Sequence, residues 1–477
     1  MELPKEFREY ATDALGQEIA QALFQQISES TEVTSIRINP NKSVSIDDVA
    51  VGEHSPVQWS RYGHYLAQRP VFTLDPLFHA GAYYVQEASS MYMELAANAI
   101  DPTGEFFRHS LNVLDLCAAP GGKTTHLASL VSRDSVLVAN EVIKSRSVIL
   151  ADNVAKWGAD NIVVTNNDPA DFSPFAGFFD LVVVDAPCSG EGLFRKDSDA
   201  VGEWSEANVN LCAQRQQRIL ADIWPALKPG GYLVYSTCTY NKFENDGNLA
   251  YLKDNFGAEI VPLHLPDGAG IIRTPGGGAQ FVPGQVKGEG QFMAVVRKNG
   301  EWEPGAFVSS AGHSKGGKKH KGGKDAKGKN QVQFDKGCSY LPSNYIKLLQ
   351  GDLVKCYREE IYEKIRFVEE NLRVVLGGIA VANKKGNDYI PHADFALQDV
   401  VAEMVAKGDL PAGISAVEVG RDDALKFLAK EPVVLENASI GYVLLVYCGM
   451  PLGFVKNLGN RTNNLLPMAR RIRMSVR

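Results

Sequence analysis

Two cysteines stand in tight turns, each after an apolar segment of the chain. Cys188 follows a proline and lies three residues after Asp185, and Cys238 lies between two threonines. A cysteine thiolate is a strong nucleophile, and a nearby carboxylate can stabilise charge that develops on the group under attack. A single cysteine is more often a small buried hydrophobic residue, but two in such similar turns favour a shared role in covalent catalysis.

This combination suits a methyl transfer to C5 of cytosine. That carbon is too weak a nucleophile to take a methyl group directly, whereas addition of a thiolate to C6 converts the ring to an enamine-like species that is reactive at C5. Loss of the C5 proton then lets the thiol leave. The addition places charge on the O2/N3 side of the ring, where Asp185 could hold a protonated N3. The spacing of the two cysteines does not decide which of them attacks.

A glycine turn could hold the methyl donor. In the segment Asp115-Leu-Cys-Ala-Ala-Pro-Gly-Gly-Lys-Thr124, an apolar run ends in small and turn-forming residues, and helical spacing begins at Lys123. A strand, a tight turn and a helix N-terminus form the usual nucleotide-binding corner of an open α/β sheet. The segment is not a P-loop, because Cys117 takes the place of the first glycine, and it lacks the Gly-x-Gly-x-x-Gly dinucleotide pattern. A nucleoside cofactor without a phosphate-binding loop remains, and S-adenosylmethionine fits.

The elements that must position these residues alternate between strands and helices. This alternation predicts an α/β fold with a doubly wound, mostly parallel sheet whose strand C-terminal ends share one edge. At that edge we expect Glu141, after the second strand, to accept hydrogen bonds from a ribose diol, and Asp168 to follow the third strand. Strands are predicted at residues 111–117, 135–140, 161–166, 179–184, 232–235 and 291–297, and helices from 123, up to 156, over 210–227 and from 243, with Lys228-Pro-Gly-Gly231 ending the helix over 210–227.

The length of 477 residues predicts two or three domains. We expect a small N-terminal α+β region at 1–75 that binds RNA or caps the sheet, the sheet domain at 76–300, a linker at 301–332 and a C-terminal α+β region at 333–477. Seven lysines between residues 309 and 330, without a large apolar side chain, predict a flexible linker. The end of the chain from residue 456 carries six positive charges and no acid, which suits an RNA backbone.

Charge and cysteine usage limit the cellular setting and the partners. The net charge is −7, so RNA would have to bind local basic patches. Arg37, in a β-like segment at 33–39, could contact a phosphate or base, or form the polar face of a half-buried strand. The seven cysteines show no CxxC pair or metal-ligand spacing, and the chain carries no secretory signal and no apolar run of membrane-spanning length. These features predict a cytoplasmic protein without a metal or membrane partner, and a monomer is expected.

Several of these segments resemble the Sun-type RNA (cytosine-5)-methyltransferases over about residues 30–300. The end of the chain, Leu452-Gly-Phe-Val-Lys-Asn-Leu-Gly-Asn-Arg461 with Asn464 and Pro467, is similar to the PUA-like RNA-binding end of the RsmF-type 16S rRNA methyltransferases. The segments that carry the first resemblance are Ser35-Ile-Arg-Ile-Asn39, Tyr84-Val-Gln-Glu-Ala-Ser-Ser-Met91, the glycine turn at 115–124, Asp185-Ala-Pro-Cys-Ser-Gly-Glu-Gly192 and Ser236-Thr-Cys-Thr239.

The resemblance implies a Rossmann-like class I methyltransferase sheet with S-adenosylmethionine as cofactor and RNA, most of all small-subunit rRNA or the 30S subunit, as partner. DNA cytosine methyltransferases attack with the Pro-Cys cysteine, whereas the RNA family uses the Thr-Cys one. By that analogy Cys238 attacks C6 and Cys188 assists release of the product, with Asp185 and Lys123 completing the catalytic set. The implied cofactor contacts are Cys117, Ala118, Ala119, Pro120, Gly121, Gly122, Lys123, Glu141, Asp168 and Asp185.

The chain departs from the family in two segments. Many relatives carry a Pro-His pair in the stretch that corresponds to residues 274–285, where this chain has no histidine. The lysine-rich linker is not a feature of the family as a whole. Two alternatives stay open, namely the same reaction on tRNA and a ribosome-assembly factor that binds RNA without catalysis. The intact set of Cys188, Cys238, Asp185 and Lys123 speaks against the second.

Overall fold

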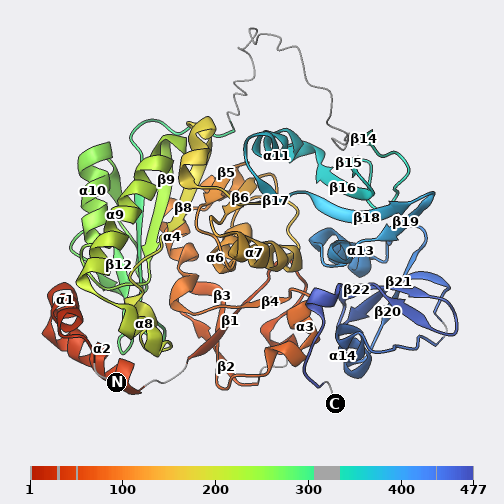
Figure 1. Cartoon of the computed structure of the whole chain (residues 1–477), viewed down its shortest axis with the longest axis horizontal. Helices are drawn as coiled ribbons and strands as arrows, with labels where there is room; N and C mark the ends of the chain where they lie inside the picture. Colours follow the sequence, from red (N-terminus) through yellow and green to blue (C-terminus); the bar gives the residue numbers. More distant parts are fainter. Residues whose placement is uncertain (1–2, 30–32, 50–51, 306–332, 437, 476–477) are drawn as a thin grey trace, which may run out of the picture.

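A ten-stranded sheet forms the centre of the molecule (Figure 1). The structure is a computed structural model, and it describes residues 3–29, 33–49, 52–305, 333–436 and 438–475. The main path of the sheet runs β11-β12-β13-β9-β8-β5-β6-β7-β17, and β10 pairs with β13. Its five middle strands, from β9 to β7, are parallel, and the strands at both ends run antiparallel to them. The predicted α/β class and doubly wound, mostly parallel sheet are therefore confirmed.

The middle strands and their helices follow the predicted alternation. The strands are β5 (Asn112–Asp115), β6 (Val136–Asn140), β7 (Ile162–Thr165), β8 (Phe179–Asp185) and β9 (Leu227–Thr237), and the flanking strands are β10 (Glu259–Val261), β11 (Ile272–Arg273), β12 (Ala279–Phe281), β13 (Gln291–Arg297) and β17 (Val374–Leu376). The helices between them are α6 (Gly122–Ala128), α7 (Lys144–Trp157), α8 (Ser198–Glu203), α9 (Glu206–Ile223) and α10 (Asp246–Phe256).

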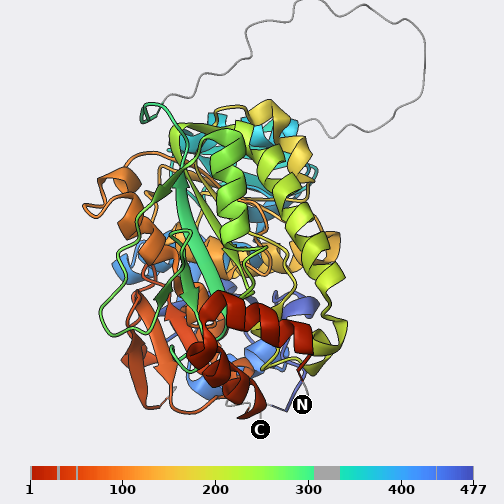
Figure 2. The ribbon, with the colours of Figure 1, turned by 90° about the vertical axis from the view of Figure 1, so that its left-hand side faces the viewer.

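Alternate side chains of each middle strand enter two separate apolar cores, as the two-residue repeat of a strand requires. Val113 of β5 packs with residues of α6, α7 and α4 (Met93–Ile100) on one face. Its neighbour Leu114 packs with residues of α9, α10 and α11 (Glu359–Asn371) on the other face. Figure 2 shows α9 and α10 side by side, with α1 (Lys5–Leu15) and α2 (Gln17–Glu29) below them.

The segment Lys228-Pro-Gly-Gly231 was predicted to end a helix, and the structure places it inside β9 instead. Helix α9 ends earlier, at Ile223, and a short 3₁₀ turn, Trp224–Ala226, leads into the strand. Lys228 is held in place because its ammonium lies 2.6 Å from the buried carboxylate of Asp180 at the start of β8. The pairing with β8 shifts register here, from Phe179 opposite Leu227 to Leu181 opposite Tyr232, so a bulge in β9 accommodates the proline and glycines.

A four-stranded antiparallel sheet lies beside the central domain near the N-terminus. Its order is β2-β3-β1-β4, and the short helix α3 (Pro76–His79) precedes its last strand. Ile36 and Tyr83 of this sheet share an apolar core with Phe427 and Leu452 from near the C-terminus. The strands are β1 (Thr34–Ile38), β2 (His54–Val57), β3 (Ser60–Leu66) and β4 (Tyr83–Val85), and the short helix α5 (Glu105–Arg108) precedes β5.

The part of the chain after the predicted linker forms two further sheets and also completes the central one. Strand β17 pairs with β7, which would otherwise be an edge strand with unpaired backbone groups. Helix α11 covers part of one face of the same sheet, where Ile365 lies in its core. The predicted C-terminal region at 333–477 is therefore not structurally independent of the sheet domain. The predicted linker at 301–332 lies mostly outside the described residues.

The two C-terminal sheets have the orders β14-β15-β16-β18-β19 and β20-β21-β22-β23. None of the helices in the described parts of the chain is long and apolar enough to cross a bilayer. The elements are β14 (Gln333–Phe334), β15 (Tyr345–Gln350), β16 (Leu353–Arg358), β18 (Ile379–Lys385), β19 (Asp388–Pro391), α12 (Ala393–Ala396), α13 (Asp399–Lys407), β20 (Ile414–Glu418), α14 (Arg421–Ala429), β21 (Gly441–Tyr447), β22 (Met450–Asn457) and β23 (Thr462–Asn464).

Candidate active site

The two predicted cysteines meet at the carboxyl edge of the central sheet. Strands β8 and β9 are parallel neighbours with Asp185 opposite Ser236, so the loops that follow them leave the sheet side by side. The Sγ atoms of Cys188 and Cys238 lie 2.8 Å apart, and the backbone N–H of Cys238 donates to Cys188 Sγ at 3.2 Å. The fold therefore joins two thiols that are 50 residues apart in the chain.

Contact and burial both affect the ionisation of Cys188. The hydrogen bond to Cys238 and burial together raise the pKa of Cys188 well above its usual value. A protonated Cys188 can donate its S–H to the sulfur of Cys238. Because only a thiolate attacks an electron-poor carbon effectively, this arrangement disfavours Cys188 as the attacking group.

Asp185 and Lys123 lie together at the same edge. Their side chains form an ion pair with 2.9 Å between Lys123 Nζ and Asp185 Oδ2, and the hydroxyl of Ser236 donates to Asp185 Oδ1 at 2.7 Å. Tyr92 in turn donates to Ser236. Burial alone would lower the pKa of Lys123, but the Asp185 carboxylate outweighs it and the pKa is raised. The carboxylate is thus fixed by two donors at the place where a positively charged ring could be bound.

The predicted glycine turn lines a cavity of about 170 Å³. Gly121 has a φ of +114°, in the region that favours glycine, and begins α6. Side chains on neighbouring elements hold the carbonyl groups of the turn: Arg146 donates to Ala119 at 2.9 Å and Asn153 donates to Pro120 at 2.8 Å. Of the predicted contact residues, Cys117, Ala118, Ala119, Pro120, Gly122, Lys123 and Asp185 line this cavity.

The two predicted acids on the later strands do not line the same cavity. Glu141 follows β6 and is buried, and its Oε1 accepts from the backbone N–H of Ile143 at 2.9 Å while Arg146 lies 3.4 Å from Oε2. Asp168 caps a short 3₁₀ helix by accepting from the N–H of Ala170 at 3.1 Å. Both acids follow strands that are parallel to β5, so they lie at the same edge of the sheet as the glycine turn.

Arg37 serves neither of the two roles considered for it from the sequence. It is fully buried, its Nε donates to Gln86 Oε1 at 2.8 Å, and its NH2 donates to Gly122 O at 3.1 Å and Thr125 Oγ1 at 2.6 Å. The N-terminal sheet thereby holds the first turn of α6 and the glycine turn. An arginine with all its partners on distant segments carries no local sequence signal for this role.

Two buried glutamates, whose role was not predicted from the sequence, connect the loops that carry Cys188 and Cys238. Glu244 accepts from the N–H of Ser189 at 3.0 Å, next to Cys188, and from Gln216 at 2.7 Å. Glu191 accepts from the N–H groups of Tyr240 at 2.8 Å and Asn241 at 3.1 Å, just after Cys238. The available sequence signal was an acidic residue, Glu191, within the Pro-Cys-Ser-Gly-Glu-Gly segment. A carboxylate that is buried there needs several hydrogen-bond donors.

The stretch at 274–285, which lacks a histidine, supports the loop that carries Cys238. It contains β12, where the side chain of Gln280 donates to Thr239 O at 3.2 Å and accepts from Asn245 Nδ2 at 3.1 Å. Gln280 is thereby fixed directly behind the turn that carries Cys238.

The basic C-terminal strip is only partly available for RNA. Arg470 is mostly buried, and its guanidinium lies 2.6 Å from both Asp152 of α7 and Asp394. Arg461, Arg471 and Arg473 are exposed, whereas Arg477 lies outside the described residues, as does the lysine-rich segment at 309–330.

Comparison with known proteins assigns three parts of the chain to one family. The profile of the 16S rRNA methyltransferase RsmB/F family matches residues 107–297. The profile of the N-terminal domain of 16S rRNA methyltransferase RsmF matches residues 3–88, and that of the methyltransferase RsmF PUA domain matches residues 415–472.

Individual relatives agree with these matches. Ribosomal RNA small subunit methyltransferase F of Shewanella sp. strain W3-18-1 is 32% identical over 455 residues, which cover 91% of this chain and 89% of that protein. The protein of the same name from Shewanella oneidensis is also 32% identical, with 91% and 90% covered.

Among solved structures, a methyltransferase homologue from Pyrococcus horikoshii superposes with a TM-score of 0.51 at 30% identity, over 62% of this chain and 95% of that chain. NSun6 from Pyrococcus horikoshii shares the fold with a TM-score of 0.52 at 20% identity, over 62% and 99% of the two chains.

Proposed function

The chain belongs to the RsmB/F family of 16S rRNA methyltransferases, and we propose that it methylates C5 of a cytosine in small-subunit rRNA through a covalent adduct with Cys238. It is an RNA methyltransferase whose cofactor is S-adenosylmethionine. The observation that carries the proposal is the pair of thiols 2.8 Å apart beside the Lys123–Asp185 ion pair. A binding module has no need of two thiols in this arrangement.

Cys238 forms the covalent bond in this mechanism. Its thiolate adds to C6, and the electron pair of the C5–C6 double bond shifts so that C5 becomes nucleophilic. N3 takes up a proton from water during the addition, and Asp185 accepts a hydrogen bond from the resulting N3–H and so stabilises the ring. When bound, S-adenosylmethionine supplies the electrophilic methyl group. Transfer of the C5 proton to water then restores the double bond as Cys238 leaves C6 as a thiolate, and N3 returns its proton to water.

Cys188 acts on the release step. Because it keeps its proton, its S–H can donate to the sulfur of Cys238 and stabilise that sulfur as it leaves C6. Lys123 orients Asp185, since its ammonium lies 2.9 Å from the carboxylate. The glycine turn and Glu141 are the residues that would hold the cofactor, with the carboxylate of Glu141 suited to a ribose diol.

We assign rRNA, free or within the 30S subunit, as the partner of a monomeric cytoplasmic enzyme. The exposed Arg461, Arg471 and Arg473 lie in or just after the part of the chain that matches the RsmF PUA domain, and they are placed to contact phosphates. Bisulfite sequencing of rRNA and tRNA from cells that lack the protein tests the substrate. Loss of a methylated cytosine in 16S rRNA supports the proposal, and loss in tRNA alone would overturn it.

Substitution of each thiol tests the mechanism. Cys238→Ala should abolish methyl transfer and leave cofactor binding intact, whereas Cys188→Ala should accumulate a covalent RNA adduct, visible as a denaturant-resistant band on a gel. Cys448→Ala, at an exposed cysteine in the C-terminal sheet, is the matched control and should behave as the parent protein. Retained turnover in Cys238→Ala would rule out this nucleophile, and absence of an adduct in Cys188→Ala would rule out the release role.

A further inference from the structure

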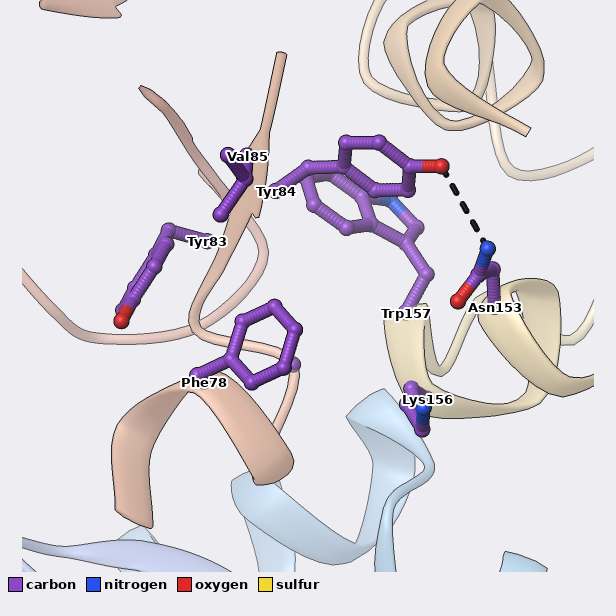
Figure 3. A pocket seen from close by; sticks show the side chains of 8 residues that line it. Phe78, Tyr83, Tyr84, Val85, Asn153, Lys156 and Trp157 are labelled. Carbon is purple, nitrogen blue, oxygen red and sulfur yellow. Dashed lines mark hydrogen bonds between the residues drawn. The ribbon is translucent and has the colours of Figure 1, made fainter. Parts of the chain in front are cut away.

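A second cavity, also of about 170 Å³, lies beside the cofactor loop, and its wall is mainly aromatic (Figure 3). In Figure 3, Tyr83 and Phe78 stand on one side of it and Tyr84 and Trp157 on the other. We call it the aromatic cavity. Its lining residues are Phe78, Gly81, Tyr83, Tyr84, Val85, Asn153, Lys156 and Trp157.

The aromatic cavity adjoins the cavity that the glycine turn lines. Tyr84 and Val85 of β4 line both of them. The hydroxyl of Tyr84 donates to Pro120 O at 3.2 Å, so its ring stands directly against the glycine turn. None of the residues predicted to bind the cofactor lines the aromatic cavity. A molecule that enters it therefore lies beside the glycine turn without occupying the predicted cofactor contacts.

The chemistry of the wall favours an uncharged flat ring. Lys156 brings the only charge among the lining residues, and its ammonium is paired at 2.7 Å with Asp152. Phe78 and Tyr84 present the partly exposed aromatic rings of this wall, whereas Trp157 and Tyr83 are buried. The volume is below the ~300–1,000 Å³ of pockets that take drug-sized ligands, which leaves room for one ring system.

The walls of the aromatic cavity are fixed to each other before any ligand arrives. The side chain of Asn39 donates to both Gly81 O and Trp157 O, each at 3.0 Å, and so ties β4 to the end of α7. A Cβ on Gly81 would lie 1.9 Å from Lys156 O, which only glycine avoids. A preformed site binds without the cost of ordering its own walls.

We propose that the aromatic cavity holds an unstacked base of the substrate RNA, a neighbour of the target cytosine on the same strand. This inference rests on the proposed function. Proteins that read single-stranded RNA stack its bases on aromatic side chains and hydrogen-bond their edges. A base in this cavity would fix the strand on one side of the target, so that the cytosine enters the active site in one register.

An abasic series tests the proposal with the full-length protein. A short RNA that contains the unmethylated target cytosine is prepared with an abasic nucleotide at each flanking position in turn. One such position should lower kcat/KM by about 5- to 150-fold, the loss expected for one base–aromatic contact. Phe78→Ala should cause a similar loss on the parent RNA, and the abasic change should add little to it, because both remove the same contact.

The controls separate this site from the rest of the enzyme. Phe334→Ala, at an aromatic side chain that is 73% exposed on β14, should leave kcat/KM unchanged. By calorimetry, the affinity of Phe78→Ala for S-adenosylhomocysteine should equal that of the parent protein. The kcat/KM of Phe78→Leu should lie between those of Phe78→Ala and the parent protein, because leucine is apolar but has no ring.

Three outcomes would overturn the inference. They are full activity on every abasic RNA, additive losses from Phe78→Ala and the abasic nucleotide, and weaker cofactor binding in Phe78→Ala. A parent enzyme that does not methylate the intact RNA would instead contradict the proposed function.

Discussion

Replacement of Glu191 by glutamine tests how the cysteine loops are held. The carboxylate of Glu191 is fully buried and accepts four hydrogen bonds. Its Oε1 accepts from Trp204 Nε1 at 3.0 Å and Asn241 Nδ2 at 2.9 Å, and its Oε2 accepts from the backbone N–H groups of Tyr240 at 2.8 Å and Asn241 at 3.1 Å. In Glu191→Gln one oxygen becomes an NH₂ group, so two buried donors lose their acceptor and face another donor.

Each buried donor without a partner costs about 1–3 kcal/mol, so the free energy of unfolding should fall by roughly 2–6 kcal/mol. If the loop relieves this cost by moving, Cys238 moves with it, and a misplacement of about 1 Å lowers kcat on the order of 100-fold. Urea denaturation and methylation kinetics measure the two effects. Glu206→Gln is the control, because its carboxylate is exposed and accepts from Tyr10 at 2.7 Å. A Glu191→Gln protein with the stability and kcat of this control would refute the reasoning.

Two other carboxylates give further predictions. Glu141→Ala should weaken binding of S-adenosylhomocysteine by about 10-fold or more, because a charged acceptor of hydrogen bonds contributes about 1.5–3 kcal/mol, and unchanged affinity by calorimetry would contradict the ribose assignment. Burial raises the pKa of Asp115 to about 7, so the folded state binds the proton more tightly than the unfolded chain, and stability is lost as pH rises from about 4 to about 7. Asp115→Asn should remove this dependence, so that its stability relative to the parent rises by at most about 1.4 kcal/mol per pH unit across that range. Equal pH profiles of urea denaturation for the two proteins would show that Asp115 does not titrate there.

The sheet and the place of the site could be predicted because their signals are local. Each middle strand is a short apolar run, and each polar residue of the edge follows such a run directly. Because parallel strands end at the same edge of a sheet, Cys188 and Cys238 can be placed together from the sequence before their contacts are known. The resemblance to a family supplied the choice of nucleophile, and the raised pKa of Cys188 disfavours that thiol as the attacking group.

The parts that escaped prediction depend on contacts between distant segments. Arg37 was considered as an RNA contact, but its partners Gln86 and Thr125 are 49 and 88 residues away. Arg470 was included among the six positive charges at the end of the chain that suit an RNA backbone. In the structure it pairs with Asp152, 318 residues earlier in the chain. The sequence shows that both residues are charged. It does not show that they are buried, because burial depends on tertiary packing.

The end of α7 shows how these distant contacts serve catalysis. Asn39 of the N-terminal region donates to Trp157 O, Arg470 of the C-terminal region pairs with Asp152, and the N–H of Asp399 donates to Gly158 O at 2.9 Å. Earlier in the same helix, Asn153 donates to the glycine turn at Pro120. Segments from both ends of the chain are therefore fastened to one helix that also holds the cofactor turn. Because these contacts are short and mostly buried, they hold the C-terminal region at a fixed distance from the glycine turn, and a reaction at a single position requires such fixed geometry.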